Sequence, residues 1–245
     1  MEDMAKQSSI TNRTDTSSSG LGGDALSPLT LVLVSCGGVG ALLFTATYVI
    51  EGFSRPGYNW LQQPVSALSL GPGGWVQQVN FVVFGILLLL SAVGWRRVLT
   101  PGRASLGFPL LQGLIGLCMI VVGFFSQDPL PGYPPGAAPT APTVHGTLHA
   151  DTAYVLFVAL AVGCFVLARR FAVESRWGRR WARYSVITGV FILLLFVLFI
   201  GTIGTALPSG LYERESAVAH ALWSCLIVAA LLIKRRNVPH QARKP

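Results

Sequence analysis

The chain has 245 residues, of which 52% are hydrophobic and only 11% are charged. Soluble domains carry about 25% charged residues, so this chain has too little polar surface for a water-soluble particle and is expected to be a polytopic membrane protein. The formal net charge of +8 would suit nucleic acid. However, the basic residues lie at the ends of apolar segments instead of forming one face, which excludes nucleic acid and favours the lipid bilayer as the partner.

Composition divides the chain into three parts. Residues 1–26 are rich in Ser, Thr and Gly with scattered charge. Such a stretch cannot bury a core, and we predict a disordered cytoplasmic tail. Residues 27–233 hold the apolar segments and are predicted to form a transmembrane domain, whereas residues 234–245 are predicted to form a basic cytoplasmic tail.

Six apolar segments follow one another in the central part. A helix needs about 20 residues to cross a hydrocarbon core of about 30 Å, and each segment reaches that length once flanking interfacial residues are included. Backbone groups in lipid must be paired within the segment, which favours helices over strands. The sequence therefore predicts an all-α fold, a bundle of six transmembrane helices over residues 28–50, 75–95, 106–125, 144–168, 184–205 and 216–233.

The basic residues indicate how this bundle is oriented. If the N-terminus is cytoplasmic, all but two of the 18 Lys and Arg residues lie on the cytoplasmic side, the exceptions being Arg55 and Arg214. Cytoplasmic loops carry an excess of Lys and Arg, and an odd number of spans would break this partition. We therefore expect a multi-pass protein of the cell (plasma) membrane with both termini in the cytoplasm.

A basic and aromatic run follows the fourth segment. It places Trp177 and Trp181 among arginines, a pattern typical of the membrane interface, where cations meet anionic lipid headgroups. Anchoring of the topology explains the run by itself. The alternative is a specific lipid-headgroup site formed by Arg176, Arg179, Arg180 and Arg183.

Three connections are expected on the extracytoplasmic side. Residues 51–74 mix Trp, Tyr, Leu and Gln, which suits a segment that lies on or dips into the interface. Residues 126–143 are rich in proline and are predicted to be extended. Residues 206–215 are predicted to form a short turn.

Ionisable residues gather at this side of the bundle. Counting about 1.5 Å per residue from the basic ends of the segments places six of them at or just below the outer boundary, namely Glu51, Asp128, His145, His149, Glu213 and His220. Ionisable side chains at this depth are costly unless they are paired or hydrated. The sequence therefore predicts a polar pocket that opens to the extracytoplasmic face, to which Ser66 would contribute a hydroxyl.

The spacing of two histidines raises the possibility of a metal site. His145 and His149 are four residues apart and share one helix face, as in two-histidine metal sites. A zinc ion needs further ligands, which Asp128 and His220 would supply. Each residue also has a structural interpretation: the histidines cap or hydrogen-bond at helix ends, Asp128 starts a turn before Pro129, and Ser66 is an ordinary loop serine.

Several short motifs carry a resemblance to a known family. They are Arg55-Pro56-Gly57-Tyr58, Ser66-Ala67-Leu68-Ser69 followed by Gly73-Gly74-Trp75, Asn80-Phe81, Phe125-Ser126-Gln127-Asp128-Pro129 and His145-Gly146-Thr147-Leu148-His149. Over about residues 28–233 the chain resembles the bacterial membrane-protein family known as domain of unknown function 998. The resemblance implies a multi-span membrane protein and brings no assigned activity, substrate or catalytic residue.

A more distant resemblance is to the membrane hydrolases that include alkaline ceramidases and adiponectin-type receptors. Those proteins use a Ser, an Asp and three His around zinc, and the residue types are present here as Ser66, Asp128, His145, His149 and His220. The chain departs from that superfamily in the number of spans and in the placing of the histidine pair.

Three functions are open at this point, and whether the protein is an enzyme is among the open questions. The first is a non-enzymatic membrane protein whose outward-facing pocket binds a lipid headgroup, a small solute or a partner. The second is a metal-dependent hydrolase that acts on a lipid or amide at the outer leaflet, where zinc would lower the pKa of bound water. Haem ligation by bundle histidines ranks last, because His145 and His149 lie too near the surface.

Overall fold

The computed structural model describes residues 27–138, 141–173 and 176–236. The predicted N-terminal tail lies outside these residues, as does most of the predicted C-terminal tail. Residues 234–236 continue the last helix.

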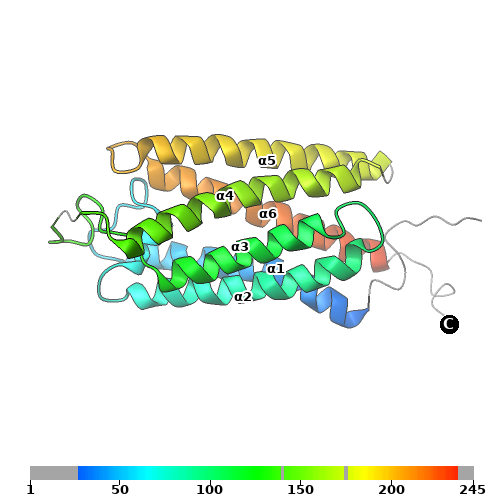
Figure 1. Cartoon of the computed structure of the whole chain (residues 1–245), viewed down its shortest axis with the longest axis horizontal. Helices are drawn as coiled ribbons and strands as arrows, with labels where there is room; N and C mark the ends of the chain where they lie inside the picture. The colour runs from blue at the N-terminus through cyan, green and yellow to red at the C-terminus, as the bar shows by residue number, and fades with distance from the viewer. Residues whose placement is uncertain (1–26, 139–140, 174–175, 237–245) are drawn as a thin grey trace, which may run out of the picture.

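Within the described residues, six α-helices and one short 3-10 helix make up the fold (Figure 1). They are α1 (Pro28–Ser54), η2 (Val65–Ser69), α2 (Gly74–Leu99), α3 (Gly107–Phe124), α4 (Val144–Phe171), α5 (Arg176–Thr202) and α6 (Ser209–Arg236). All six α-helices are long and apolar enough to cross a membrane. The described part of the chain contains no strand, so the prediction of an all-α bundle of six long apolar helices is confirmed.

Two helices begin earlier than the sequence predicted. α5 begins at Arg176 and α6 begins at Ser209, because the backbone ladder continues past the apolar core into polar sequence. The predicted turn over residues 206–215 is therefore wrong from Ser209 onward. A tertiary contact helps α6 to begin there: the Leu211 N–H, one of the first-turn donors, is shared between the carbonyl of Leu61 at 3.0 Å and that of Pro208 at 3.1 Å.

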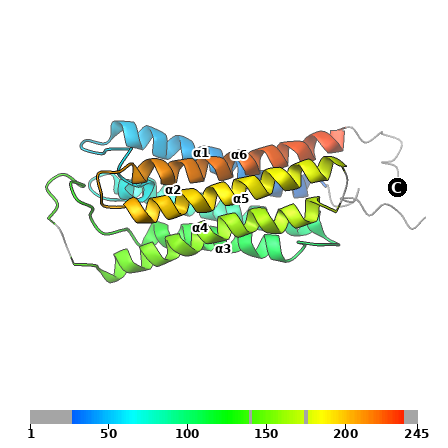
Figure 2. The ribbon, with the colours of Figure 1, turned by 90° about the horizontal axis from the view of Figure 1, so that it is seen from above.

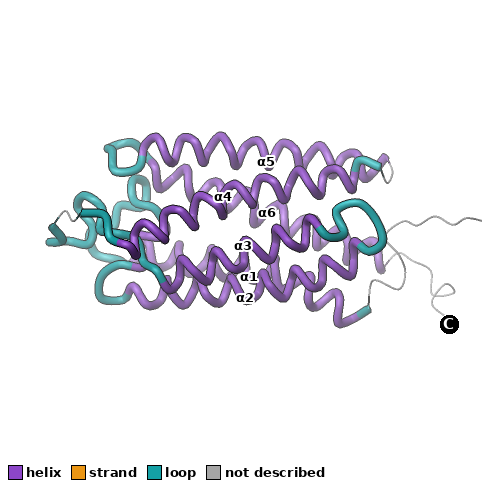
Figure 3. The backbone as a smooth tube through the Cα atoms, viewed as in Figure 1, coloured by secondary structure: helices purple, strands orange, loops and turns teal. Residues whose placement is uncertain are grey.

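The helices form a closed ring in chain order. Each α-helix packs on the next, and α6 returns to pack on α1, with α5 lying between α4 and α6 (Figure 2). The start of α1 and the end of α6 lie at the same end of the ring (Figure 1). This end, which we call the basic end, carries Arg96 and Arg97 in the last turn of α2, Arg169 and Arg170 in the last turn of α4, and the arginines of the first turns of α5. The opposite end, the loop end, carries the long connections (Figure 3).

Glycines allow a close crossing of α2 and α3. A Cβ added to Gly85 would lie 2.6 Å from the carbonyl oxygen of Gly116, and one added to Gly116 would lie 2.8 Å from that of Gly85. Both contacts are with backbone atoms that cannot rotate away. The two helices therefore approach so closely that neither position tolerates a side chain without a backbone shift.

We expect Gly116→Ala to lower the free energy of unfolding by about 1–3 kcal/mol, the cost of overpacking a close contact. Gly113→Ala is the matched control, because a Cβ on Gly113 of the same helix meets nothing within 4 Å. Since alanine is the better helix former by about 1 kcal/mol, the control should be neutral or stabilising. Thermal unfolding in mild detergent measures both, and equal shifts would disprove the close crossing.

The connection between α1 and α2 folds into the loop end of the ring. Residues 63–70 are all buried, and η2 packs on α1, α2 and α6. The sequence predicted a segment that lies on the interface or dips into it. In the fold, this segment enters the bundle and closes the loop end of its interior.

Candidate functional site

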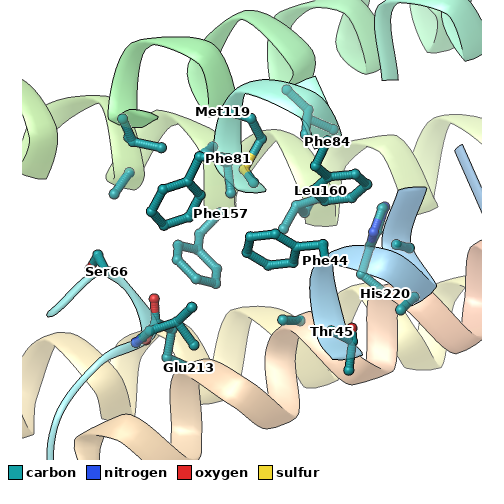
Figure 4. Close-up of a pocket in the computed structure, with 18 of the residues that line it drawn as sticks. Phe44, Thr45, Ser66, Phe81, Phe84, Met119, Phe157, Leu160, Glu213 and His220 are labelled. Atoms are coloured by element: carbon teal, nitrogen blue, oxygen red, sulfur yellow. The ribbon is translucent and has the colours of Figure 1, made fainter. Parts of the chain in front are cut away.

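A cavity of about 80 Å³ lies inside the ring, below η2. Its walls are mainly aromatic and aliphatic, and come from α1, α2, α3, α4 and α6, with η2 at one end (Figure 4). The larger apolar residues around it include Phe44, Phe81, Phe84, Met119, Phe157 and Leu160. A polar cavity of about 10–15 Å³ is enough to hold one water. The space is therefore large enough for several waters or a small organic molecule.

Helical periodicity explains which residues of α4 and α6 reach the cavity. On α6 the lining residues are Glu213, Ala217, His220 and Ala221, a spacing that keeps them on one face. On α4 the lining face begins at His149 and continues through Ala153, Leu156, Phe157 and Leu160. Small residues on these faces leave the space. His149 and Glu213, near the starts of their helices, place polar groups toward the loop end, whereas His220 lies further along α6 (Figure 4).

Two polar contacts form the part of the cavity next to η2. The N–H of Val65 donates to Oε2 of Glu213 at 2.5 Å. The hydroxyl of Ser66 donates to Oε1 of Gln127 at 2.7 Å. Ser66 and Glu213 both line the cavity, so the first connection and α6, which are distant in sequence, meet at its loop end.

The two buried histidines of the cavity differ in their partners. His149 is 4% exposed, and its Nδ1 lies 2.7 Å from the carbonyl oxygen of Phe125. A carbonyl only accepts, so Nδ1 carries the proton and Nε2 of the neutral ring is an acceptor. His220 is 6% exposed, and its ring packs against Trp223 with centroids 5.5 Å apart.

His220 has no hydrogen bond to any residue that the structure describes. Buried polar side-chain atoms in folded proteins nearly always have a partner. Because the ring lines the cavity, a water or a ligand in that space would supply the partner. The sequence predicted that this deep histidine needs a polar partner. In the structure the cavity, and not a side chain of another helix, offers the place for one.

An arginine fastens the first connection to α6. Arg214 is 6% exposed, and its Nη1 donates to the carbonyls of Trp60 at 2.6 Å, Gln63 at 2.9 Å and Gly210 at 2.8 Å. Its Nη2 donates to the hydroxyl of Tyr58. Five-donor guanidinium groups suit such multiple carbonyl contacts. We call Arg214 with these partners the arginine clamp.

Tyr58 completes the clamp on the side of the connection. Its hydroxyl donates to the carbonyl of Pro64 at 2.8 Å. Burial raises the pKa of Tyr58 well above its usual value, although the Arg214 charge acts in the opposite direction. Burial therefore favours the protonated hydroxyl, the form that donates to Pro64.

Three of the predicted pocket residues lie elsewhere. Glu51 pairs with Arg55 at 2.6 Å on the last turns of α1. His145 is exposed and packs against Phe125, with ring centroids 5.1 Å apart. Asp128 accepts from the N–H and the hydroxyl of Thr143 at 2.9 and 2.6 Å. The cavity therefore brings together Ser66, His149, Glu213 and His220, but not Glu51, Asp128 or His145.

Asp128 has a structural role at the start of α4. Thr143 is the N-cap residue, and its Oγ1 accepts the N–H of Gly146 at 3.0 Å. The Asp128 carboxylate holds Thr143 in place, and a Cβ on Gly146 would overlap that carboxylate. A negative charge at a helix N-terminus is also favourable electrostatically.

We expect Asp128→Ala to lower the free energy of unfolding by about 1–2 kcal/mol through loss of this cap. Asp151→Ala, at an exposed position of α4, is the control and should have little effect. Thermal unfolding of each variant with and without zinc checks the interpretation. A zinc-induced stabilisation that disappears only in Asp128→Ala would show that the residue is a metal ligand instead.

Among the residues that the structure describes, no group of three or more His, Cys, Asp or Glu side chains is close enough to hold a metal ion. The predicted set of His145, His149, His220 and Asp128 is divided between the cavity and the start of α4. Zinc binding is not tested by this arrangement and stays a prediction.

The sequence reasoning missed the clamp and Gln127. One signal was available for Arg214: it is one of only two basic residues on the side of the bundle where basic residues are scarce. An arginine in that position has no topological role, which points to a specific structural one. Nothing in the sequence singled out Gln127 as the partner of Ser66.

The fold defines a polytopic α-helical membrane protein with a cavity inside the ring of helices. A family model described as "Protein of unknown function (DUF998)" matches residues 38–230, most of the chain. The chain belongs to this family, which confirms the resemblance inferred from the motifs. No curated protein and no solved structure matches the chain.

Proposed function

We propose that the protein binds a small amphipathic ligand in the cavity, with the apolar part of the ligand between the helices and a hydrogen-bond-donating end near Glu213. The observation that carries this proposal is the lining itself: rings of Phe44, Phe81, Phe84 and Phe157 surround a space that also exposes acceptors. Binding sites for small molecules are mostly apolar with a few convergent polar groups.

The lining favours an amine or a hydroxyl at the polar end of the ligand. Oε2 of Glu213 accepts the Val65 N–H, which leaves Oε1 for a ligand donor. The nitrogens of His220 have no partner among the described residues, and the unprotonated nitrogen of a neutral imidazole is a further acceptor. Aromatic faces attract cations, so a protonated amine suits both the Glu213 carboxylate and the rings. His220 lies about 10 Å further along α6 and would take a separate donor.

We further infer that the basic end faces the cytoplasm of the cell membrane, so that the cavity lies nearer the extracytoplasmic face. The distribution of arginine supports this orientation. A cysteine introduced at Gly136, in the α3–α4 connection, should react with an impermeant thiol reagent added outside the cell. Labelling only after the cytoplasmic side is opened would reverse the orientation.

Short-chain compounds test the binding proposal. We expect hexylamine to raise the thermal unfolding midpoint of the detergent-solubilised protein, hexanol to raise it less, and hexanoate least because its carboxylate has no hydrogen-bond donor for Glu213. A ligand present at about 100 times its Kd stabilises the folded state by about 2.7 kcal/mol. Equal shifts from all three compounds would contradict the proposed polar end.

A matched variant separates the charge from the shape of the cavity. In Glu213→Gln the side-chain carbonyl still accepts the Val65 N–H, but the charge is lost. The preference for hexylamine over hexanol should therefore disappear while the response to hexanol remains. A preference that survives unchanged would show that Glu213 does not contact the amine.

A metal-dependent hydrolase is the second candidate, favoured by the presence of Ser66, His149, Glu213 and His220 around one cavity. Elemental analysis of the purified protein tests it. One zinc per chain that is lost in a His149→Ala, His220→Ala double variant would support the hydrolase. Metal-free protein that responds normally to hexylamine would support ligand binding alone.

A further inference from the structure

A second hollow lies on the outer surface of the bundle, at the basic end between α5 and α6. It is a groove of about 350 Å³ lined by Trp177, Arg180, Trp181, Tyr184 and Leu226. The four residues from α5 follow helical spacing and share one face of that helix. This groove shares no lining residue with the cavity, and no step of the binding proposal uses it.

The aromatic residues of the groove form a continuous row. The rings of Trp177 and Trp181 meet edge to face with centroids 5.5 Å apart, and those of Trp181 and Tyr184 do so at 5.9 Å. Trp177 is 42% exposed and Arg180 is exposed as well. Tryptophan and tyrosine are enriched where a membrane meets water, because their rings are apolar and their N–H and O–H groups are polar.

The polar groups of the groove are available to a ligand. Neither indole N–H nor the guanidinium of Arg180 has a hydrogen bond to a described residue. Together they present donors and one positive charge on the outer surface of a membrane-spanning helix. Guanidinium groups bind phosphate through two parallel hydrogen bonds, and charged pairs of this kind are the stronger ones.

The surroundings of the groove indicate a lipid. Leu226 forms part of the groove, and exposed apolar side chains such as Ile187 and Leu222 continue along α5 and α6 toward the middle of the spans. A free phosphate ion would have no use for this apolar surface, whereas the acyl chains of a phospholipid would cover it. The remaining arginines at this end add to the local positive potential.

We propose that this groove is a binding site for one anionic phospholipid, with the headgroup phosphate on Arg180 and the indole N–H groups and an acyl chain against Leu226. The sequence suggested a headgroup site made of four arginines. The geometry assigns the role to Arg180 alone, because Arg176, Arg179 and Arg183 do not line the groove.

Tryptophan quenching by brominated lipids tests the site on the full chain in mild detergent. Brominated phosphatidylglycerol should quench the fluorescence at lower concentration than brominated phosphatidylcholine with the same chains. In Arg180→Gln the concentration for half-maximal quenching by phosphatidylglycerol should rise about fivefold, the effect of one interfacial arginine. Arg179→Gln, an equally exposed neighbour on another face of α5, is the matched control and should change it little.

Three outcomes would overturn the proposal. Equal losses in Arg180→Gln and Arg179→Gln would show diffuse attraction to the basic end. Full competition by inorganic phosphate would show a free-anion site. Lipid-selective quenching that persists in a Trp177→Phe, Trp181→Phe double variant would place the lipid elsewhere, since four tryptophans remain of the six in the chain.

Discussion

Replacing Arg214 with alanine is expected to lower the free energy of unfolding by about 3–5 kcal/mol, the largest effect of any single substitution considered. The change removes a buried guanidinium, leaves the carbonyl of Trp60 without its partner, and leaves the carbonyl of Gln63 with only the Tyr58 hydroxyl. Hydrogen bonds to charged groups contribute about 1.5–3 kcal/mol each, and buried acceptors left unpaired add a penalty. For a chain of this length, the thermal midpoint should fall by roughly 10 °C.

Two further variants show whether the clamp is responsible. Arg183→Ala removes an exposed arginine from the basic end and should have little effect. Arg214→Lys keeps the charge but not the planar fork of donors, so it should recover only part of the loss. Comparable midpoints for Arg214→Ala and Arg183→Ala would show that the clamp contributes little.

Hydrogen exchange would locate the effect of Arg214→Ala in the structure. The clamp joins the first connection to the start of α6, so its loss should increase amide exchange in residues 58–69 before the rest of the bundle opens. Uniformly faster exchange would instead indicate a general destabilisation. The localised result would also show that η2 is held in the bundle by α6 rather than by its own sequence.

Filling the cavity should abolish ligand binding. Ala217 lines the cavity on α6, one turn from both Glu213 and His220, so Ala217→Leu places three additional carbon atoms in the space the ligand would use. We expect the apparent affinity for hexylamine to fall at least about tenfold, which corresponds to about 1.4 kcal/mol. The thermal midpoint without ligand should stay the same or rise, because filling a cavity is commonly stabilising.

Ala229→Leu is the matched control for this experiment. It makes the same change on the same helix at an exposed position, and it should leave the response to hexylamine intact. A normal response in Ala217→Leu would place the ligand outside the cavity and remove the main support for the proposed function. Isothermal titration or the thermal-shift titration described above provides the measurement.

Local features of the sequence were sufficient to predict the architecture. Segment length and hydrophobicity determine how many helices can cross a membrane, since the backbone must be satisfied within each segment. The ends of α5 and α6 were predicted less well. Sequence reasoning placed each start at the beginning of the apolar run, whereas the backbone ladder continues for two further turns, supported for α6 by contact with Leu61.

The composition of the candidate site depended on tertiary structure. Depth along each helix could be counted from the sequence, and that count placed His149, Glu213 and His220 toward one end of the bundle. Asp128 and His145 have the same depth but not the same direction: Asp128 holds the cap of α4, and His145 faces outward.

The sequence by itself determined that this is a six-span membrane protein with scarce polar groups gathered at one end, because length, hydrophobicity and charge act segment by segment. Only the tertiary structure decided which of those groups meet. The rotation of each helix about its axis and the folding of residues 63–70 into the ring bring Ser66 and Glu213 to one cavity. Both depend on side-chain packing between segments that are distant in the chain, and that information is not present in any one of them.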